Sequence, residues 1–383
     1  MLSKLHSLIP AGLCLAAFAL ASPAAAQHPL GPPLEVNVPS ADIVELSSLA
    51  MNAGGDFVVT WVGTGEPRQL LARRFAADGT PTTGEIAVAD DPVPGADNSK
   101  VAIRDDGSFI VVFGVFPDLI VRTYGADGSF GIERVLVLLA SGRGFRLALM
   151  PGGGFALAWL RDSFSFVRRF DATGLPYGPE RRVGPGGPPA VAAQPDGGFV
   201  VTWTANRPEA DPRYGDPYLV AQRFGADGER KGGRILLQSP LTPGSIDTNA
   251  VASDAAGDFL ALWQGTIGSG PLADGIYARR FRADGVPLTR RLRLEGGTAL
   301  SPQLAMDRAG NFVVAWLQLA AGPNGQTGAF AQRFTAGGTP FRPAFRVDAG
   351  GSGEPLVASD ASGNFVVVWT QPRKIFAQRY RKR

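Results

Sequence analysis

One short segment of this sequence concentrates side chains suited to binding or catalysis. Between residues 207 and 216 stand two arginines, one glutamate, two aspartates and one tyrosine: Arg207, Glu209, Asp211, Arg213, Tyr214 and Asp216. Carboxylates of this kind serve in cation binding and in general acid–base catalysis, and arginine and tyrosine are frequent anchors of interfaces. The segment is therefore a candidate site for a sugar, a cation or a protein. A solvated, charged surface loop is the alternative.

Two basic residues form a second candidate site. Lys100 and Arg146 each stand nine residues before a phenylalanine, Phe109 and Phe155, that belongs to the same recurring motif. If the copies of that motif surround an axis, the two side chains lie on adjacent copies near the axial channel. They would then form a positive entrance for an anionic ligand. The alternative is that both side chains simply reach solvent.

Three aspartates raise the question of a calcium site. Asp254, Asp307 and Asp360 each stand three residues before a glycine, in a D-x-x-G pattern. A calcium loop needs several oxygen ligands at alternating positions, whereas this pattern offers one carboxylate in a tight turn, where aspartate is favoured for its local hydrogen bonds. We therefore expect no metal site and no cofactor.

The N-terminus is typical of a secretory signal. A basic start at Lys4 precedes an apolar run over 8–20, and three alanines at 24–26 provide a small-residue cleavage site before Gln27. The apolar run is too short to span a bilayer. The sequence thus predicts a signal peptide over 1–26 and one exported domain over 27–383. We expect no membrane insertion.

Export would leave the mature chain with few catalytic residue types. Cys14 is the only cysteine, and of the two histidines only His28 lies beyond residue 26. Thiolate chemistry, disulfides and Cys/His zinc sites are excluded, and a Ser-His-Asp triad is disfavoured. The mature chain carries 36 basic and 34 acidic residues, and this balance gives no reason to expect nucleic acid as a partner.

A repeated motif organises the rest of the chain. The segments GDFVVTW, GSFIVVF, GGFALAW, GGFVVTW, GDFLALW, GNFVVAW and GNFVVVW recur at intervals of 52, 46, 44, 60, 53 and 53 residues. An alanine stands seven residues before each motif phenylalanine, and all six tryptophans of the protein occupy the last motif position. Such a period indicates seven copies of one structural unit.

Each copy contains the signals of four short strands, which we name a to d. Strand a ends near the constant alanine, strand b is the F-V-V-x-W segment, strand c ends in a motif of the type A-Q-R-F, and strand d follows a turn of the type A-D-G. Four strands in about fifty residues, bounded by glycine and aspartate turns, match the blade of a β-propeller. A solenoid is the alternative.

The two ends of the chain favour a closed ring over a solenoid. The seventh copy stops after its strand c at residues 380–383, and the segment GPPLEVNV over 31–38 resembles the turn and strand d of the other copies. The N-terminal strand can therefore complete the last blade and remove the exposed sheet edges. We predict an all-β, seven-bladed β-propeller of four-stranded blades that is closed in this way.

These motifs also resemble those of a known group of proteins. The combination of F-V-V-x-W, A-Q-R-F and A-D-G-x-P is similar to the repeats of exported bacterial β-propeller proteins, most of them uncharacterised. The resemblance covers essentially the whole mature chain and implies the fold and the export. It brings no catalytic residue to any position of this sequence.

Variation among the copies indicates which face of the ring binds a ligand. The a–b turns are short and uniform, but the b–c connection from tryptophan to the next motif aromatic takes 11 residues in the third copy and 21 in the fourth. Variable loops on a rigid scaffold usually carry binding residues. We therefore expect a monomeric, non-catalytic protein that binds a protein or a glycan through the b–c face. The alternatives are a carboxylate-dependent propeller glycosidase or lyase, and a structural or adhesive surface protein.

Overall fold

The computed structural model describes residues 27–38, 44–63, 65, 67–90, 99–115, 117–137, 144–206, 217–238, 246–266, 274–296, 299–319, 327–348, 353–371 and 373–382. Two predictions lie outside this part of the chain: the signal peptide over 1–26 and the candidate segment over 207–216. Within it, every regular element is a β-strand, and no helix is long and apolar enough to cross a membrane.

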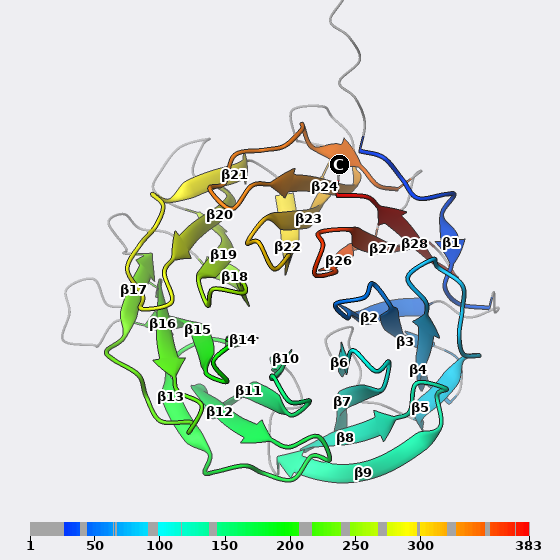
Figure 1. Ribbon diagram of the computed structural model, residues 1–383, viewed down its shortest axis with the longest axis horizontal. Helices are drawn as coiled ribbons and strands as arrows, with labels where there is room; N and C mark the ends of the chain where they lie inside the picture. Colours follow the sequence, from blue (N-terminus) through cyan, green and yellow to red (C-terminus); the bar gives the residue numbers. More distant parts are fainter. Residues whose placement is uncertain are drawn as a thin grey trace, which may run out of the picture.

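The described strands form seven four-stranded antiparallel sheets arranged as the blades of a ring (Figure 1). Blade 1 consists of β2 (Val44–Met51), β3 (Phe57–Gly63), β4 (Gln69–Phe75) and β5 (Ile86–Asp90). Blade 2 consists of β6 (Ser99–Ile103), β7 (Phe109–Val115), β8 (Asp118–Tyr124) and β9 (Phe130–Val137). Blade 3 consists of β10 (Arg146–Leu149), β11 (Phe155–Arg161), β12 (Phe164–Phe170) and β13 (Arg181–Pro185).

Blades 4 to 6 repeat this plan, and blade 7 combines strands from both ends of the chain. Blade 4 consists of β14 (Ala190–Ala193), β15 (Phe199–Asn206), β16 (Pro217–Phe224) and β17 (Ile235–Gln238), and blade 5 of β18 (Ile246–Ser253), β19 (Phe259–Thr266), β20 (Asp274–Phe281) and β21 (Leu292–Gly296). Blade 6 consists of β22 (Ala299–Met306), β23 (Phe312–Gln318), β24 (Gly328–Phe334) and β25 (Phe345–Arg346). Blade 7 consists of β26 (Leu356–Ser359), β27 (Phe365–Gln371), β28 (Lys374–Tyr380) and the N-terminal β1 (Leu34–Glu35). The predicted seven-bladed propeller is confirmed.

Ring closure follows the predicted pairing of the two ends of the chain. In blade 7, β1 pairs with β28 in the register Leu34 opposite Ala377. Backbone bonds extend this pairing on both sides, from Leu30 N to the carbonyl of Arg379 and from Val36 N to that of Ile375, each 2.8 Å long. The N-terminal strand therefore supplies strand d of the last blade, at the blue and red ends of the chain in Figure 1.

The repeated aromatic residues pack within and between the blades. In all seven blades, the motif aromatic of strand b stacks on the aromatic at the end of strand c, with ring centroids 4.8 to 5.2 Å apart. The six tryptophans are at most 3% exposed. Trp203 of blade 4, for example, packs in one core cluster with Val183 of blade 3. These contacts fix the spacing of adjacent blades.

Blades 2 and 3, whose strand c departs from the A-Q-R-F pattern, are built like the others. Tyr124 stacks on Phe109 and Phe170 stacks on Phe155 in the same geometry. The aromatic position is therefore the essential part of the strand c motif. The residues before it vary without changing the strand.

Candidate functional site

The aspartates of the a–b turns hold the backbone of those turns. Asp254 Oδ1 accepts hydrogen bonds from the backbone N–H groups of Ala256 and Asp258, at 2.9 and 3.0 Å. Asp360 bonds its own turn in the same way. The described residues contain no group of three or more metal-ligating side chains. The hydrogen bonds to their own turns give Asp254 and Asp360 a turn-stabilising role.

In five blades, the arginine before the last aromatic of strand c connects the blade to the next one. Its guanidinium donates to the carbonyl of the alanine that opens the next blade's c–d turn. This contact joins Arg74 to Ala126, Arg169 to Ala226, Arg223 to Ala283, Arg280 to Ala336 and Arg379 to Ala77. These arginines are therefore inter-blade contacts of the scaffold.

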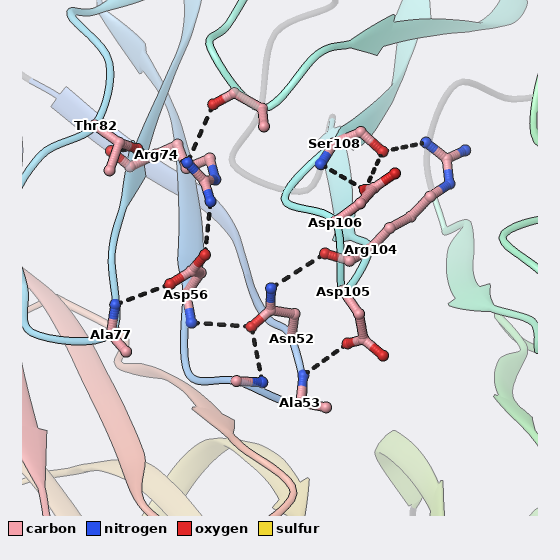
Figure 2. A network of polar contacts seen from close by, with 12 residues as sticks. Asn52, Ala53, Asp56, Arg74, Ala77, Thr82, Arg104, Asp105, Asp106 and Ser108 are labelled. Carbon is pink, nitrogen blue, oxygen red and sulfur yellow. Dashed lines mark hydrogen bonds and ion pairs between the residues drawn. The ribbon is translucent and has the colours of Figure 1, made fainter.

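Figure 2 shows how this scaffold network joins blades 1 and 2. Arg74 pairs with Asp56 at 2.6 Å, and the amide of Asn52 donates to the carbonyl of Arg104 in the next turn at 3.1 Å. The backbone N–H of Ala53 donates to Asp105 Oδ1 at 3.1 Å. The a–b turns of neighbouring blades are thus locked to one another.

Blade 2 makes the inter-blade contact from a different position. Thr123 stands where the other blades carry the arginine, and Arg104 of the a–b turn donates instead to the carbonyls of Ala172 and Gly153, both at 2.9 Å. Partial burial lowers the pKa of Arg104 from its usual value. Arg104 therefore takes over the structural role of the missing strand c arginine.

The a–b turns surround a cavity of about 950 Å³, which we call the turn-face funnel. All seven blades line it, and Met51, Met150 and Met306 contribute thioethers from the ends of their strands a. Hydrogen bonds from Ser108 lower the pKa of Asp106 at its rim. The sequence analysis did not predict this cavity, because the turns that surround it are uniform. The available signal was that Met51, Met150 and Met306, the three methionines after residue 26, stand five or six residues before the motif phenylalanine of their copies.

A second cavity, of about 630 Å³, lies on the opposite face, which carries the b–c and d–a connections. We call this face the loop face and the cavity the loop-face pocket. Its lining comes from blades 3, 4 and 5 and consists of Gly144, Arg146, Ser163, Phe164, Pro185, Gly186, Gly187, Pro188, Pro189, Thr204, Pro217, Ile246, Thr248 and Asn249. Among the described residues that line this pocket, Arg146 is the only one with a charged side chain.

Local backbone geometry shapes the pocket wall in blade 3. The two-residue turn between β11 and β12 has positive φ at Asp162 and Ser163, 50° and 62°, as a tight hairpin of this type requires. Gly186 has φ 135°, and a Cβ there would collide with the carbonyl oxygen of Thr204. The N–H of Gly186 donates to Ser163 O at 3.0 Å, so the hairpin and the β13–β14 connection are bound together.

Lys100 and Arg146 come together at one buried residue, Phe145. The Lys100 ammonium lies 5.8 Å from the centroid of the Phe145 ring, and Arg146 Nη1 donates to the Phe145 carbonyl at 3.0 Å. Arg146 also lines the loop-face pocket. The structure thus places the two predicted cations on adjacent blades, each in contact with Phe145, and their role in binding stays a prediction.

The other candidate residues, Arg207, Glu209, Asp211, Arg213, Tyr214 and Asp216, lie outside the described residues. The described chain on either side of them ends at Asn206 and resumes at Pro217, and these two residues pair across β15 and β16. Pro217 lines the loop-face pocket. The predicted binding segment is therefore attached at the rim of this pocket.

Comparisons with known proteins identify the fold and no closer relationship. No protein-family model and no curated protein matches the sequence. Among solved structures, the chain is similar to a protein of unknown function from Dyadobacter fermentans DSM 18053, with TM-score 0.51, 13% identity and coverage of 91% of this chain and 99% of that one. It is also similar to the Dos1 propeller, with TM-score 0.52, 9% identity and coverage of 91% and 95%.

A third similar structure is that of an enzyme. It is a mutant of the α-L-arabinofuranosidase arb93a from Fusarium graminearum in complex with an iminosugar inhibitor, with TM-score 0.51, 10% identity and coverage of 91% of this chain and 97% of that one. At these identities the likeness concerns the propeller fold alone. Proteins of unlike function share it.

Proposed function

We propose that this protein is an exported, non-catalytic propeller that binds a protein or a glycan through its loop face. The observation that carries the proposal is the loop-face pocket, whose rim holds the attachment points of the variable segment 207–216. Export rests on the N-terminal sequence pattern alone.

The lining of the pocket is suited to ligand binding. Its volume of about 630 Å³ falls within the range of about 300–1,000 Å³ that is usual for ligand sites. The lining combines apolar proline and phenylalanine surfaces with a few hydroxyl and amide groups and one arginine. Such a mixture provides contact area together with directional hydrogen bonds, as binding sites require.

A carboxylate-dependent glycosidase or lyase is the second candidate, because one protein with a similar fold is an arabinofuranosidase. Glycoside hydrolysis uses two carboxyl groups about 5 to 10 Å apart. The described lining of the loop-face pocket contains no carboxylate. In this candidate function, two of the three residues Glu209, Asp211 and Asp216 would therefore supply the two carboxyl groups. Binding without turnover is therefore the simpler function for this site. A structural or adhesive surface role differs from it only in the partner.

A glycan array and a panel of purified extracellular proteins, probed with the mature protein, test this proposal. We expect a bound ligand that is recovered chemically unchanged. Thr248→Trp, which fills the pocket from an exposed position, should abolish binding, and so should combined alanine replacement of Arg207, Asp211, Tyr214 and Asp216. Val286→Trp, at a position 48% exposed beside the c–d turn of blade 5, is the matched control and should bind normally.

Two results would contradict the proposal. Release of shortened sugar products by the wild-type protein would favour the glycosidase or lyase. Binding that both the Thr248→Trp variant and the alanine variant retain would remove the function from the loop face.

A further inference from the structure

We propose that the loop-face pocket accepts an acidic sugar, a uronate unit of an extracellular polysaccharide, and that Arg146 binds its carboxylate. This inference rests on the proposed function and specifies its ligand class.

The charge of the pocket argues for an anionic ligand. Arg146 uses one donor on the Phe145 carbonyl, and a guanidinium has five. Among the described residues, no carboxylate forms an ion pair with Arg146; Glu180, of the same blade, is bound by Arg161. An arginine fork that faces a concave surface and lacks a carboxylate partner matches the planar, two-oxygen geometry of a carboxylate.

A second cation lies on the adjacent blade, outside the pocket lining. The Lys100 ammonium lies over the ring of Phe145, whose backbone carbonyl accepts a hydrogen bond from Arg146. Lys100 also donates to the Ser99 carbonyl at 3.0 Å and is not among the residues that line the pocket. Arg146 is therefore the cation that is placed to meet a bound carboxylate.

The polar groups of the lining are suited to sugar hydroxyls. Asn249 accepts a hydrogen bond from Thr202 at 2.7 Å and donates one to the Pro188 carbonyl at 3.1 Å. These bonds fix the orientation of the Asn249 amide, whose second N–H hydrogen stays available as a donor. Ser163, Thr204 and Thr248 add hydroxyl groups that both donate and accept, arranged around the same cavity.

The apolar part of the lining is suited to the C–H face of a sugar ring. Phe164 and the prolines at 185, 188, 189 and 217 line the cavity. The guanidinium of Arg182 lies 3.4 Å from the centroid of the Phe164 ring and holds that ring in place by a cation–π contact. The pocket therefore presents a rigid apolar surface beside its polar groups.

The pocket is also preformed, which favours a small, stiff ligand. Ser165 Oγ donates to the Gly187 carbonyl at 2.9 Å, and Gly187 N donates to the Thr204 carbonyl at 2.8 Å. A rigid sugar ring entering a rigid cavity loses little conformational freedom, whereas an acidic peptide would have to order its backbone. We therefore favour a uronate over an acidic peptide.

Calorimetric titration of the mature protein tests the inference. The probes are oligomers of galacturonate, glucuronate and mannuronate, each compared with its carboxyl-reduced neutral form, together with oligoglutamate. We expect at least one uronate oligomer to bind at least about tenfold more tightly than its neutral form. Arg146→Gln should remove that difference, and Arg146→Lys, which keeps the charge but not the fork, should retain part of it.

The matched control is Arg290→Gln, which replaces an exposed arginine remote from the pocket and should leave the affinity unchanged. Thermal melting of each variant confirms that it is folded. If acidic and neutral sugars bind equally well and Arg146→Gln does not change either affinity, the inference is overturned and the proposed function remains. Arg146-dependent binding of oligoglutamate without any uronate binding would replace the sugar by an acidic peptide. Absence of any ligand, in this titration and on the array, would end both proposals.

Discussion

Arg379, at the end of blade 7, donates a hydrogen bond of 2.7 Å from Nη1 to the carbonyl oxygen of Ala77 in blade 1. Arg74 makes the same contact from blade 1 to Ala126 in blade 2, at 3.1 Å. The interface between blade 7 and blade 1 is thus closed by the same type of hydrogen bond that joins blade 1 to blade 2. The ring uses the strand c arginine as a repeated link.

Loss of this link at the ring closure should destabilise the protein. Arg379→Ala removes the bonds to Ala77 and to the Leu30 carbonyl at 3.1 Å. A hydrogen bond to a charged group contributes about 1.5–3 kcal/mol when it is buried. Because one of these two bonds is exposed and the other only partly buried, we expect a total loss of about 1.5–3 kcal/mol in the free energy of unfolding. Urea unfolding measures it. Arg290→Ala, at an exposed position, is the control, and an equal effect in both variants would contradict the interpretation.

Removal of residues 27–38 should open the ring. The deletion leaves β28 without its partner strand β1 and creates an exposed sheet edge that favours association. We expect a lower melting temperature and oligomers in size-exclusion chromatography. A synthetic peptide covering 27–38, added in trans, should restore both properties. A truncated protein that stays monomeric and equally stable would show that the N-terminal strand is dispensable.

The buried pair of Asp254 and Arg280 should contribute strongly to stability. Their side chains are 5% and 6% exposed. Asp254→Ala leaves the buried Arg280 charge with only the longer pair to Asp258, at 4.0 Å, so we expect a loss that approaches about 3–5 kcal/mol, which is typical of a broken buried pair. Asp105→Ala, at an exposed position of the equivalent turn region, should cost much less. Chemical denaturation of both variants at neutral pH makes the comparison, and equal losses would contradict it.

The role that we assign to Arg104 leads to a rescue experiment. Arg104→Ala should lower stability by about 1.5–3 kcal/mol, because it removes charged hydrogen bonds to Ala172 and Gly153. Adding Thr123→Arg restores the arginine at the position that the other blades use. We expect the double variant to recover part of the loss, as measured by urea unfolding. A further loss in the double variant would show that blade 2 cannot accept the usual link.

Acid should weaken the c–d turn of blade 5. Hydrogen bonds from Arg282 and from the Val286 backbone lower the pKa of Asp284 from 3.8 to about 2. A carboxyl group whose pKa is lowered by folding stabilises the protein above its unfolded pKa, and this contribution disappears as the pH falls through the folded value. We expect stability to decrease between about pH 4 and pH 2.

The variant Asp284→Asn should reduce the acid sensitivity of stability in this pH window. Urea midpoints measured at pH 7 and pH 2.5 for the wild type and the variant provide the test. A pH dependence that is identical in the two proteins would show that Asp284 does not contribute.

The candidate sites were only partly predictable from the sequence. The equivalent positions of Lys100 and Arg146 indicated that both lie on adjacent blades near the axis. Their meeting at Phe145, and the position of Arg146 in a pocket with Asn249, depend on how three blades are placed side by side. The turn-face funnel was missed for a similar reason, because seven short turns form a cavity only when the ring brings them together.

The sequence by itself determined the blade, the number of blades and the way the ring closes. Each copy has to bury the same aromatic face and turn at the same glycine, so the repeat of Phe57 through Phe365 specifies seven equivalent sheets, and the segment 31–38 supplies the missing strand. Only the tertiary structure decided where the cavities lie and which side chains share them. Residues that recur in every copy indicate only the packing that all copies share. The pocket around Arg146 forms between copies that differ in sequence, and the distances across it are set by the packing of the whole ring.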